Sequence, residues 1–179
     1  MKFFSNIHSD LLRFSNNGGA LRNLKIVLVS HSFHLVALYR IGVFASKLPL
    51  GGELIRVFFE YLIRIVYASD ISLRSKIGPG LVIMHGHDIV IGSAVVIGEN
   101  CKILNGVTLG NKDTESSVNQ QPIVGDNVVI GSGAKILGSI VVGDGAKIGA
   151  NSVIIKDVPS GATVVGVPGR LISIDGSAR

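Results

Sequence analysis

Aliphatic residues recur at every sixth position through the second part of the chain, and a glycine usually follows each of them. The repeating positions are Ile71, Ile77, Ile83, Ile91, Ile97, Ile103, Leu109, Val124, Ile130, Ile136, Val142, Ile148 and Ile154. A helix repeats every 3.6 residues and a strand every two, so neither alone produces a period of six. Short strands joined by turns and wound into stacked coils do produce it, and they bury one shared aliphatic core. We therefore predict a mainly β fold, a parallel β-helix over residues 70–171, with three faces and three hexads in each coil.

Two interruptions of the repeat mark candidate functional segments. Ile83 and Ile91 are eight residues apart, so two residues are extra near His87. Leu109 and Val124 are fifteen apart, so three extra residues accompany a polar stretch, 111–122, which we expect to loop out of the solenoid. Sites in repeat proteins tend to form where the repeat is broken, which favours function over a neutral surface insertion.

The residues before the repeat, 1–69, predict a helical segment. The expected helices cover residues 1–14, 20–46 (as one or two helices) and 53–67. In the last of these, Arg56, Glu60 and Arg64 are spaced four apart and form one charged stripe. The rest of that helix is apolar and must be covered by another helix, the β-helix, a neighbouring subunit or a membrane face, of which we favour packing in the core. At the other end of the chain, we expect residues 172–179 to be a frayed tail.

The net charge of +5 belongs to the helical segment. Residues 1–69 carry eight Lys or Arg and three acidic residues, whereas residues 70–179 carry nine of each. Such a segment attracts an anionic lipid surface or an acidic partner, although we slightly favour ordinary solubility as the explanation of the charge. No nucleic-acid-binding motif and no secretory signal pattern is found in the sequence. The single cysteine, Cys101, excludes an internal disulfide and is interpreted as a packing residue. We expect a cytoplasmic protein that contacts the inner membrane, if at all, through residues 1–69.

Two histidines lie at the first interruption of the repeat. His85 is the third residue of its hexad and should point outward, which makes it a candidate general base, although an exposed histidine is usually inert. His87 falls on an inward-pointing position, and no third ligand is evident, so we expect no metal site. The sequence contains no Ser-His-Asp motif, phosphate-binding loop or dinucleotide fingerprint.

Several stretches resemble the serine acetyltransferase branch of the hexapeptide-repeat acyltransferases, and together they reach from about residue 30 to 172. They are FHLVALYRIG (33–42), ASDISLRSKIGPGLVIMHGHDIVIG (68–92), NGVTLGN (105–111), PIVGDNVVIGSGAKILGSIVVGDGAKIGANSVI (122–154) and VVGVPGRLI (164–172). The resemblance implies a left-handed β-helix and an acetyl-CoA-dependent O-acetyltransferase. It also implies that acetyl-CoA lies in a groove between neighbouring subunits. The family usually forms a dimer of trimers, but the helical segment is shorter here, so we expect a homotrimer.

The resemblance also implies roles for individual residues. His85 matches the general base, and Asp70 matches the carboxylate that orients it. An imidazole can take the proton of a hydroxyl as it attacks a thioester, and a carboxylate fixes the tautomer of that imidazole. A coil of three hexads projects Asp70 onto residue 88, however, so Asp88 is a rival for the orienting role. Small positions that line the acetyl-CoA groove match Gly110, Ser132 and Ala150, and a basic one that can meet a phosphate matches Lys147.

Three departures from the family pattern concern the acceptor. Serine acetyltransferases carry an acidic residue before the catalytic histidine, where this chain has Met84. They carry an Arg-His pair before the loop proline, where this chain has Gln120 and Gln121. An uncharged acceptor pocket suits a sugar better than an amino acid, so we expect the acceptor to be a sugar hydroxyl of a surface polysaccharide or its lipid-linked precursor. A serine O-acetyltransferase and a catalytically inactive β-helix scaffold are the alternatives.

Overall fold

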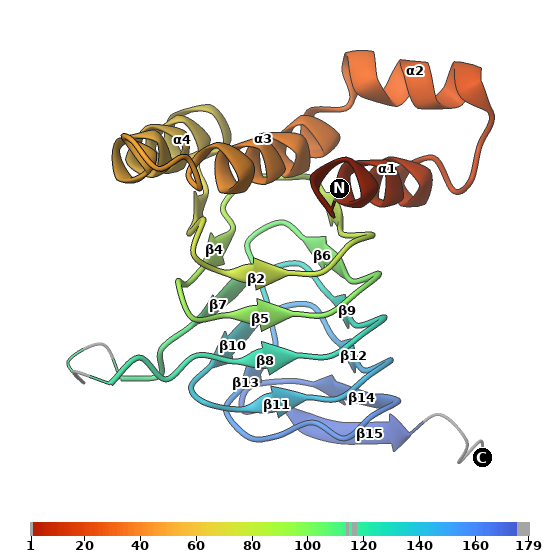
Figure 1. Cartoon of the computed structure of the whole chain (residues 1–179). Helices are drawn as coiled ribbons and strands as arrows, with labels where there is room; N and C mark the ends of the chain where they lie inside the picture. The colour runs from red at the N-terminus through yellow and green to blue at the C-terminus, as the bar shows by residue number, and fades with distance from the viewer. Residues whose placement is uncertain (1, 114, 116–117, 175–179) are drawn as a thin grey trace.

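A helical layer covers one end of a β solenoid in the computed structural model, which describes residues 2–113, 115 and 118–174 (Figure 1). The helices are α1 (Lys2–Phe14), α2 (Ala20–Val29), α3 (His31–Ala45) and α4 (Gly52–Tyr67). The first strand begins three residues after α4, so the helical layer lies directly on the first coil. The predicted helices are thus present, with residues 20–46 forming two of them.

The strands of the described residues form three sheets, one on each face of the solenoid. The first sheet contains β1 (Asp70–Ile71), β4 (Val90–Ile91), β7 (Thr108–Gly110), β10 (Lys135–Leu137) and β13 (Val153–Ile154). The second contains β2 (Lys76–Ile77), β5 (Val96–Ile97), β8 (Ile123–Val124) and β11 (Val141–Val142). The third contains β3 (Val82–Met84), β6 (Lys102–Leu104), β9 (Val129–Ile130), β12 (Lys147–Ile148), β14 (Ala162–Val165) and β15 (Arg170–Ile174). Neighbouring strands are parallel except for β14 and β15, which confirms the predicted parallel β-helix.

The coils descend from the helical layer while the strands on the near face, β2, β5, β8 and β11, all point to the right (Figure 1). That combination is a left-handed winding. The usual crossover between parallel strands is right-handed, so this handedness came from the resemblance and not from the repeat.

The pairing of strands between neighbouring coils shows how many residues each interruption adds to its coil. Ile91 pairs with Leu109, a separation of three hexads, which is the regular coil. Ile77 pairs with Ile97, so the coil between them is two residues longer than the regular one, as predicted. Ile97 pairs with Val124, so the second interruption lengthens its coil by nine residues and not by three. The prediction counted two hexads between Leu109 and Val124, but the chain turns only one corner there and the remaining residues loop out.

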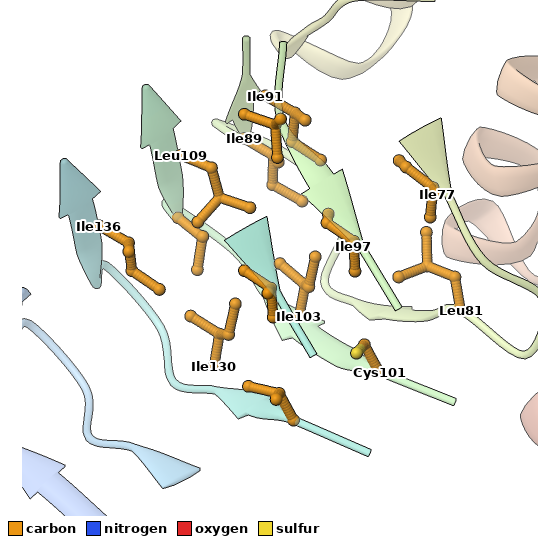
Figure 2. Close-up of a cluster of buried hydrophobic side chains, with 14 of the residues drawn as sticks. Ile77, Leu81, Ile89, Ile91, Ile97, Cys101, Ile103, Leu109, Ile130 and Ile136 are labelled. Atoms are coloured by element: carbon orange, nitrogen blue, oxygen red, sulfur yellow. The ribbon is translucent and has the colours of Figure 1, made fainter. Parts of the chain in front are cut away.

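The repeating aliphatic residues form one continuous ladder inside the solenoid. Figure 2 shows Ile91, Leu109 and Ile136 of the first sheet pointing toward Ile103 and Ile130 of the third. All of these are fully buried, and burial of each such side chain contributes about 1.5–3 kcal/mol.

Cys101 lies in a second, smaller row of inward-pointing residues. It is fully buried, and its thiol donates a hydrogen bond to the carbonyl oxygen of Gly125. Burial raises the pKa of the Cys101 thiol, which keeps the sulfur protonated. The structure confirms that Cys101 is a packing residue.

A buried ion pair joins the helical layer to the first coil. The Asp10 carboxylate of α1 accepts a hydrogen bond from Arg40 Nε of α3 at 2.9 Å. Arg40 also donates to the carbonyl oxygens of Ile77 and Gly78, both at 2.6 Å. Asp10 in turn accepts the backbone N–H of Leu81 at 2.9 Å. Each charge therefore has its partner and further hydrogen bonds, which a buried pair requires.

Helix α4 buries Ile63 and Tyr67, but it also turns part of its charged stripe toward the solenoid. The Glu60 carboxylate accepts hydrogen bonds from the backbone N–H of Leu73, at 2.9 Å, and from Arg56, at 2.6 Å. The side chains of Arg56 and Glu60 are only 19% and 17% exposed. The residues that are instead more than half exposed are Leu54, Val57, Phe58, Tyr61 and Ile65.

The prediction that the apolar surface of this helix packs in the core is therefore wrong for these five residues, although Ile63 and Tyr67 of the same helix are buried in the core. The strand N–H groups of the first coil donate to the second coil, as Ser72 N does to the Ile91 carbonyl at 2.9 Å, whereas the N–H of the buried Leu73 lies in a turn and donates to Glu60. A buried N–H without an acceptor is costly. Glu60 supplies that acceptor, and this contact places Glu60 and Arg56 against the solenoid while Arg64 stays about half exposed. The apolar residues on the far side of α4 are left outward.

The first residues of the predicted frayed tail, 172–179, are ordered. Residues 172–174 belong to β15 and are not frayed, whereas residues 175–179 lie outside the described part.

Within the described residues, no single helix is long and apolar enough to cross a membrane. Helices α2 and α3 together meet that test of length and composition, but they are bent by 81° where they join.

Candidate active site

His85 lies in a turn that joins β3 to β4, at the corner between the third and first sheets. His85 and Asp88 have left-handed backbone conformations, with φ of +55° and +56°. The turn is held by hydrogen bonds from His87 N to the His85 carbonyl, at 2.8 Å, and from Asp88 N to the Ala68 carbonyl, at 3.2 Å. The His85 side chain is exposed, as predicted. His87 is exposed as well, so its predicted inward position is wrong, because the two extra residues of this turn displace the hexad pattern.

The Asp70 carboxylate contacts a residue that the sequence did not indicate. Asp70 Oδ2 accepts a hydrogen bond from Arg64 of α4 at 2.8 Å, and both side chains are about half exposed. Asp70 pairs with Val90 on the next coil, because that coil is two residues longer than the regular one, so the projection onto residue 88 is wrong. Within the described residues, neither Asp70 nor Asp88 is hydrogen bonded to His85. The acid that orients the histidine therefore stays a prediction.

Turns from successive coils stack beneath the His85 turn and form a column, which we call the His85 corner (residues 85–88, 105–106, 132–133 and 150–151). Backbone hydrogen bonds connect it from coil to coil, from Gly106 to His87, from Gly133 to Asn105 and from Asn151 to Ser132. Strands in neighbouring coils are about 4.8 Å apart, so three steps along this corner cover roughly 14 Å.

Two of the predicted groove positions lie on the His85 corner. Ser132 is partly buried, and its hydroxyl donates to Asn105 Oδ1 at 3.0 Å. Ala150 is exposed one coil further down. Lys147 is exposed on β12, just before that turn. The corner thus presents small side chains below His85 and one cation near its far end.

Gly110 and the predicted acceptor residues lie elsewhere. Gly110 ends β7 at the corner between the first and second sheets, and no atom lies within 4 Å of the place where a Cβ would be. The loop that follows carries Gln120, which is exposed, and Gln121, whose amide oxygen accepts the backbone N–H of Ala94 at 2.8 Å. The resemblance grouped Gly110 with Ser132, but within one chain the first sheet separates them.

Proteins of known family resemble this chain in both sequence and structure. The family model "Bacterial transferase hexapeptide (six repeats)" matches residues 121–156. The serine acetyltransferase of Synechococcus elongatus is 36% identical over 161 residues, which are 89% of this chain and 64% of that protein. The crystal structure of serine acetyltransferase from Brucella abortus in complex with coenzyme A has a TM-score of 0.87 and 33% identity. It is matched over 97% of this chain and 68% of its own.

The chain belongs to the hexapeptide-repeat transferase family. Soybean serine acetyltransferase complexed with serine is also similar to this hexapeptide-repeat transferase, with a TM-score of 0.85, 34% identity and coverage of 95% of this chain and 69% of that one. The chain spans less than two-thirds of the length of the Synechococcus protein.

The comparisons correct the predicted acceptor. The proteins that this hexapeptide-repeat transferase resembles over most of its length are serine acetyltransferases, so the expectation of a surface polysaccharide or a lipid-linked sugar is wrong. That expectation relied on missing charges at Met84, Gln120 and Gln121. The structure explains part of the error, because the Gln121 side chain is bonded to the backbone of its own solenoid at Ala94. Its lack of charge therefore says little about an acceptor pocket.

Proposed function

We propose that this chain is an acetyl-CoA-dependent O-acetyltransferase whose acceptor is L-serine. The observation that carries this proposal is the similarity to serine acetyltransferases over nearly the whole solenoid and its helical layer. The exposed His85 at the head of a column of small residues supports it, because a base and a donor groove then lie on one corner.

His85 acts as the general base. Its ring takes the proton of the serine hydroxyl as the oxygen attacks the thioester carbonyl carbon. A new C–O bond forms, the C–S bond breaks, and the sulfur of coenzyme A takes up the proton, so the products are O-acetylserine and coenzyme A. A carboxylate on the other ring nitrogen would stabilise the imidazolium. Asp70 is our candidate for it, since Arg64 occupies its Oδ2 and leaves Oδ1, while Asp88 is the rival.

The donor lies along the His85 corner. Ser132 and Ala150 are small enough to let an extended chain approach the solenoid backbone. Lys147 lies near the far end, where an ammonium group can attract a phosphate of coenzyme A. This arrangement places the thioester beside His85 and the nucleotide end of the donor roughly three coils away.

Gly110, Gln120 and Gln121 join the site only if a neighbouring chain brings its other corner against the His85 corner. We therefore propose a homotrimer, in which each of three equivalent grooves is lined by two chains. Light scattering after size-exclusion chromatography should give three times the chain mass of 18.8 kDa. A monomer that turns over at the full rate would contradict the shared groove.

The acceptor and the base can be tested together. The release of free thiol from acetyl-CoA in the presence of serine is measured for the unmodified chain and for the His85→Ala variant. Removal of a general base should lower kcat by about 10²–10⁴-fold while the trimer persists. Turnover that is undiminished in His85→Ala removes His85 from the mechanism. Turnover with other hydroxyl compounds but none with serine overturns the acceptor.

We also propose that α2 meets an anionic membrane surface from the cytoplasmic side. Helix α2 has no buried residue, and its exposed positions include Leu21, Leu24 and Leu28 next to the cations Arg22 and Lys25. Exposed leucines with flanking cations are the composition of helices that lie in a membrane interface.

This chain should co-sediment with vesicles that contain phosphatidylglycerol and should not co-sediment with vesicles of phosphatidylcholine alone. Added salt should weaken the binding, and Leu24→Glu with Leu28→Glu should abolish it. The absence of binding to either kind of vesicle overturns this contact. A larger assembly that is lost in the double variant would instead assign α2 to a second copy.

A further inference from the structure

A serine of the helical layer is hydrogen bonded to the turn that carries His85. The backbone N–H of Gly86 donates to Ser32 Oγ at 3.1 Å, across 54 residues of sequence. Ser32 lies in the first turn of α3, and Gly86 directly follows His85. Gly86 is buried although His85 and His87 on either side of it are exposed, so this N–H depends on the protein for its acceptor.

The backbone of His85 needs such support. A residue with a side chain at φ of +55° is disfavoured by roughly 1–2 kcal/mol, and it persists only where its surroundings fix it. On one side of His85, Met84 is fixed by its strand pairing with Leu104 of β6. On the other side, the hydrogen bond of Gly86 to Ser32 is the one nearest to His85, and hydrogen bonds of His87 and Asp88 join the rest of the turn to Gly106 and Ala68.

The first turn of α3 fits closely against Gly86. A Cβ added there would lie 3.0 Å from Cδ2 of Leu35 and 3.2 Å from Cγ2 of Ile83. Leu35 is fully buried, so this packing remains when the hydroxyl of Ser32 is removed. The apolar contacts thus maintain the fold, while the hydroxyl adds a bond with a fixed direction to the turn.

The position of Ser32 itself is set by its neighbours. The His31 ring packs against Tyr67 of α4, with ring centroids 4.4 Å apart and the ring planes tilted by 34°. Ser30 caps α3, since its hydroxyl accepts the backbone N–H of Phe33 at 3.3 Å. The His31–Tyr67 contact and the buried Leu35 thus hold the start of α3 in place, and Ser32 presents its oxygen to Gly86 from there. The cap of Ser30 adds to the stability of the helix without contacting the turn.

We propose that Ser32 is a positioning residue for the reaction. Its hydroxyl holds the turn at Gly86, and this turn orients the His85 ring toward the acceptor hydroxyl. This role rests on the proposed function, because it has no meaning unless His85 is the base. Without the hydroxyl, a buried N–H loses its acceptor at a cost comparable to the strain at His85, so the turn relaxes and the ring moves.

The test compares Ser32→Ala with Ser30→Ala, which removes the cap of the same helix but no contact to the turn. Ser32→Ala should lower kcat about tenfold with the KM for acetyl-CoA unchanged. Ser32→Thr, which keeps an oxygen at the same place, should recover most of that loss. Ser30→Ala should lower the melting temperature and leave kcat as it is.

The outcomes separate the two proposals. If turnover in the unmodified chain does not depend on His85, the proposed function fails, and this role fails with it. If turnover depends on His85 but Ser32→Ala matches the unmodified chain, only the role of Ser32 is overturned. Equal losses of kcat in Ser32→Ala and Ser30→Ala would also overturn it, since both would then act through the stability of α3.

Discussion

The solenoid and the helical layer respond to the same polarity pattern in opposite ways. In the solenoid, the aliphatic position of each hexad points inward, as at Ile97 and Leu109. In α4, Glu60 and Arg56 are mostly buried, whereas Leu54, Val57, Phe58, Tyr61 and Ile65 are more than half exposed. Each inner coil receives its backbone hydrogen bonds from the coils beside it, so the polarity of its side chains decides which of them are buried. At the end of the stack, the turn N–H of Leu73 takes its acceptor from Glu60 of the covering helix.

The largest expected effect breaks the junction between the two regions. Asp10→Ala leaves the guanidinium of Arg40 buried without its carboxylate, which should cost about 3–5 kcal/mol. Thermal unfolding followed by circular dichroism should show the helical signal lost at a lower temperature than the strand signal. Asp10→Asn retains an acceptor and should lose less. A single transition with unchanged midpoint would show that this ion pair does not hold the layer on the solenoid.

A cavity in the solenoid should cost nearly as much, but in a different place. Leu109→Ala removes a fully buried side chain from the middle of the ladder and should destabilise the chain by about 2–5 kcal/mol. Because the ladder is continuous, both spectral signals should fall together in the same melting experiment. Loss confined to one signal would mean that the coils do not unfold as a unit.

A smaller effect tests the reason for the orientation of α4. Glu60→Ala removes the acceptor of the Leu73 N–H and should cost about 1–3 kcal/mol. Glu60→Gln keeps a carbonyl oxygen there and should recover part of the loss, as measured by urea unfolding. If the two variants are equally stable, the charge and not the hydrogen bond holds the helix in this orientation.

The smallest effect is expected on the outer face of α4. Phe58→Ser replaces an exposed aromatic ring and should change the stability of the isolated chain by no more than about 0.5 kcal/mol. The same urea titration, run at low protein concentration, measures it. A larger loss that grows with protein concentration would show that another chain covers this face.

The hexad repeat predicted much of the solenoid, because one regular spacing states which side chains are buried. It gave the three faces, the inward ladder and the outward direction of His85. It did not give the contact between Arg64 and Asp70, since that depends on how α4 is turned. Nor did it give the contact between Ser32 and Gly86, which joins residues far apart in a sequence that has no repeat before Ile71.

The hexad pattern could have predicted on which corner of the solenoid each groove residue lies. Hexads alternate among three sheets, so Ser132 and Ala150, which follow aliphatic positions of the third sheet, share a corner. Gly110 follows a position of the first sheet and belongs to another corner. The count failed because the polar loop was taken to contain a hexad that does not exist. Where the repeat is interrupted, the sequence therefore does not show how many faces of the solenoid the segment covers.

The final strand has a consequence for how copies of this chain can meet. β15 runs antiparallel to β14 and is the outermost strand of the third sheet, whereas the other pairings within that sheet are parallel. Open edges of stacked sheets are templates on which further molecules add and fibrils grow. With a reversed strand at one end and helices at the other, this solenoid is hindered from lengthening end to end. The reversed strand protects the third face alone, because β13 and β11 are the last strands of the other two sheets.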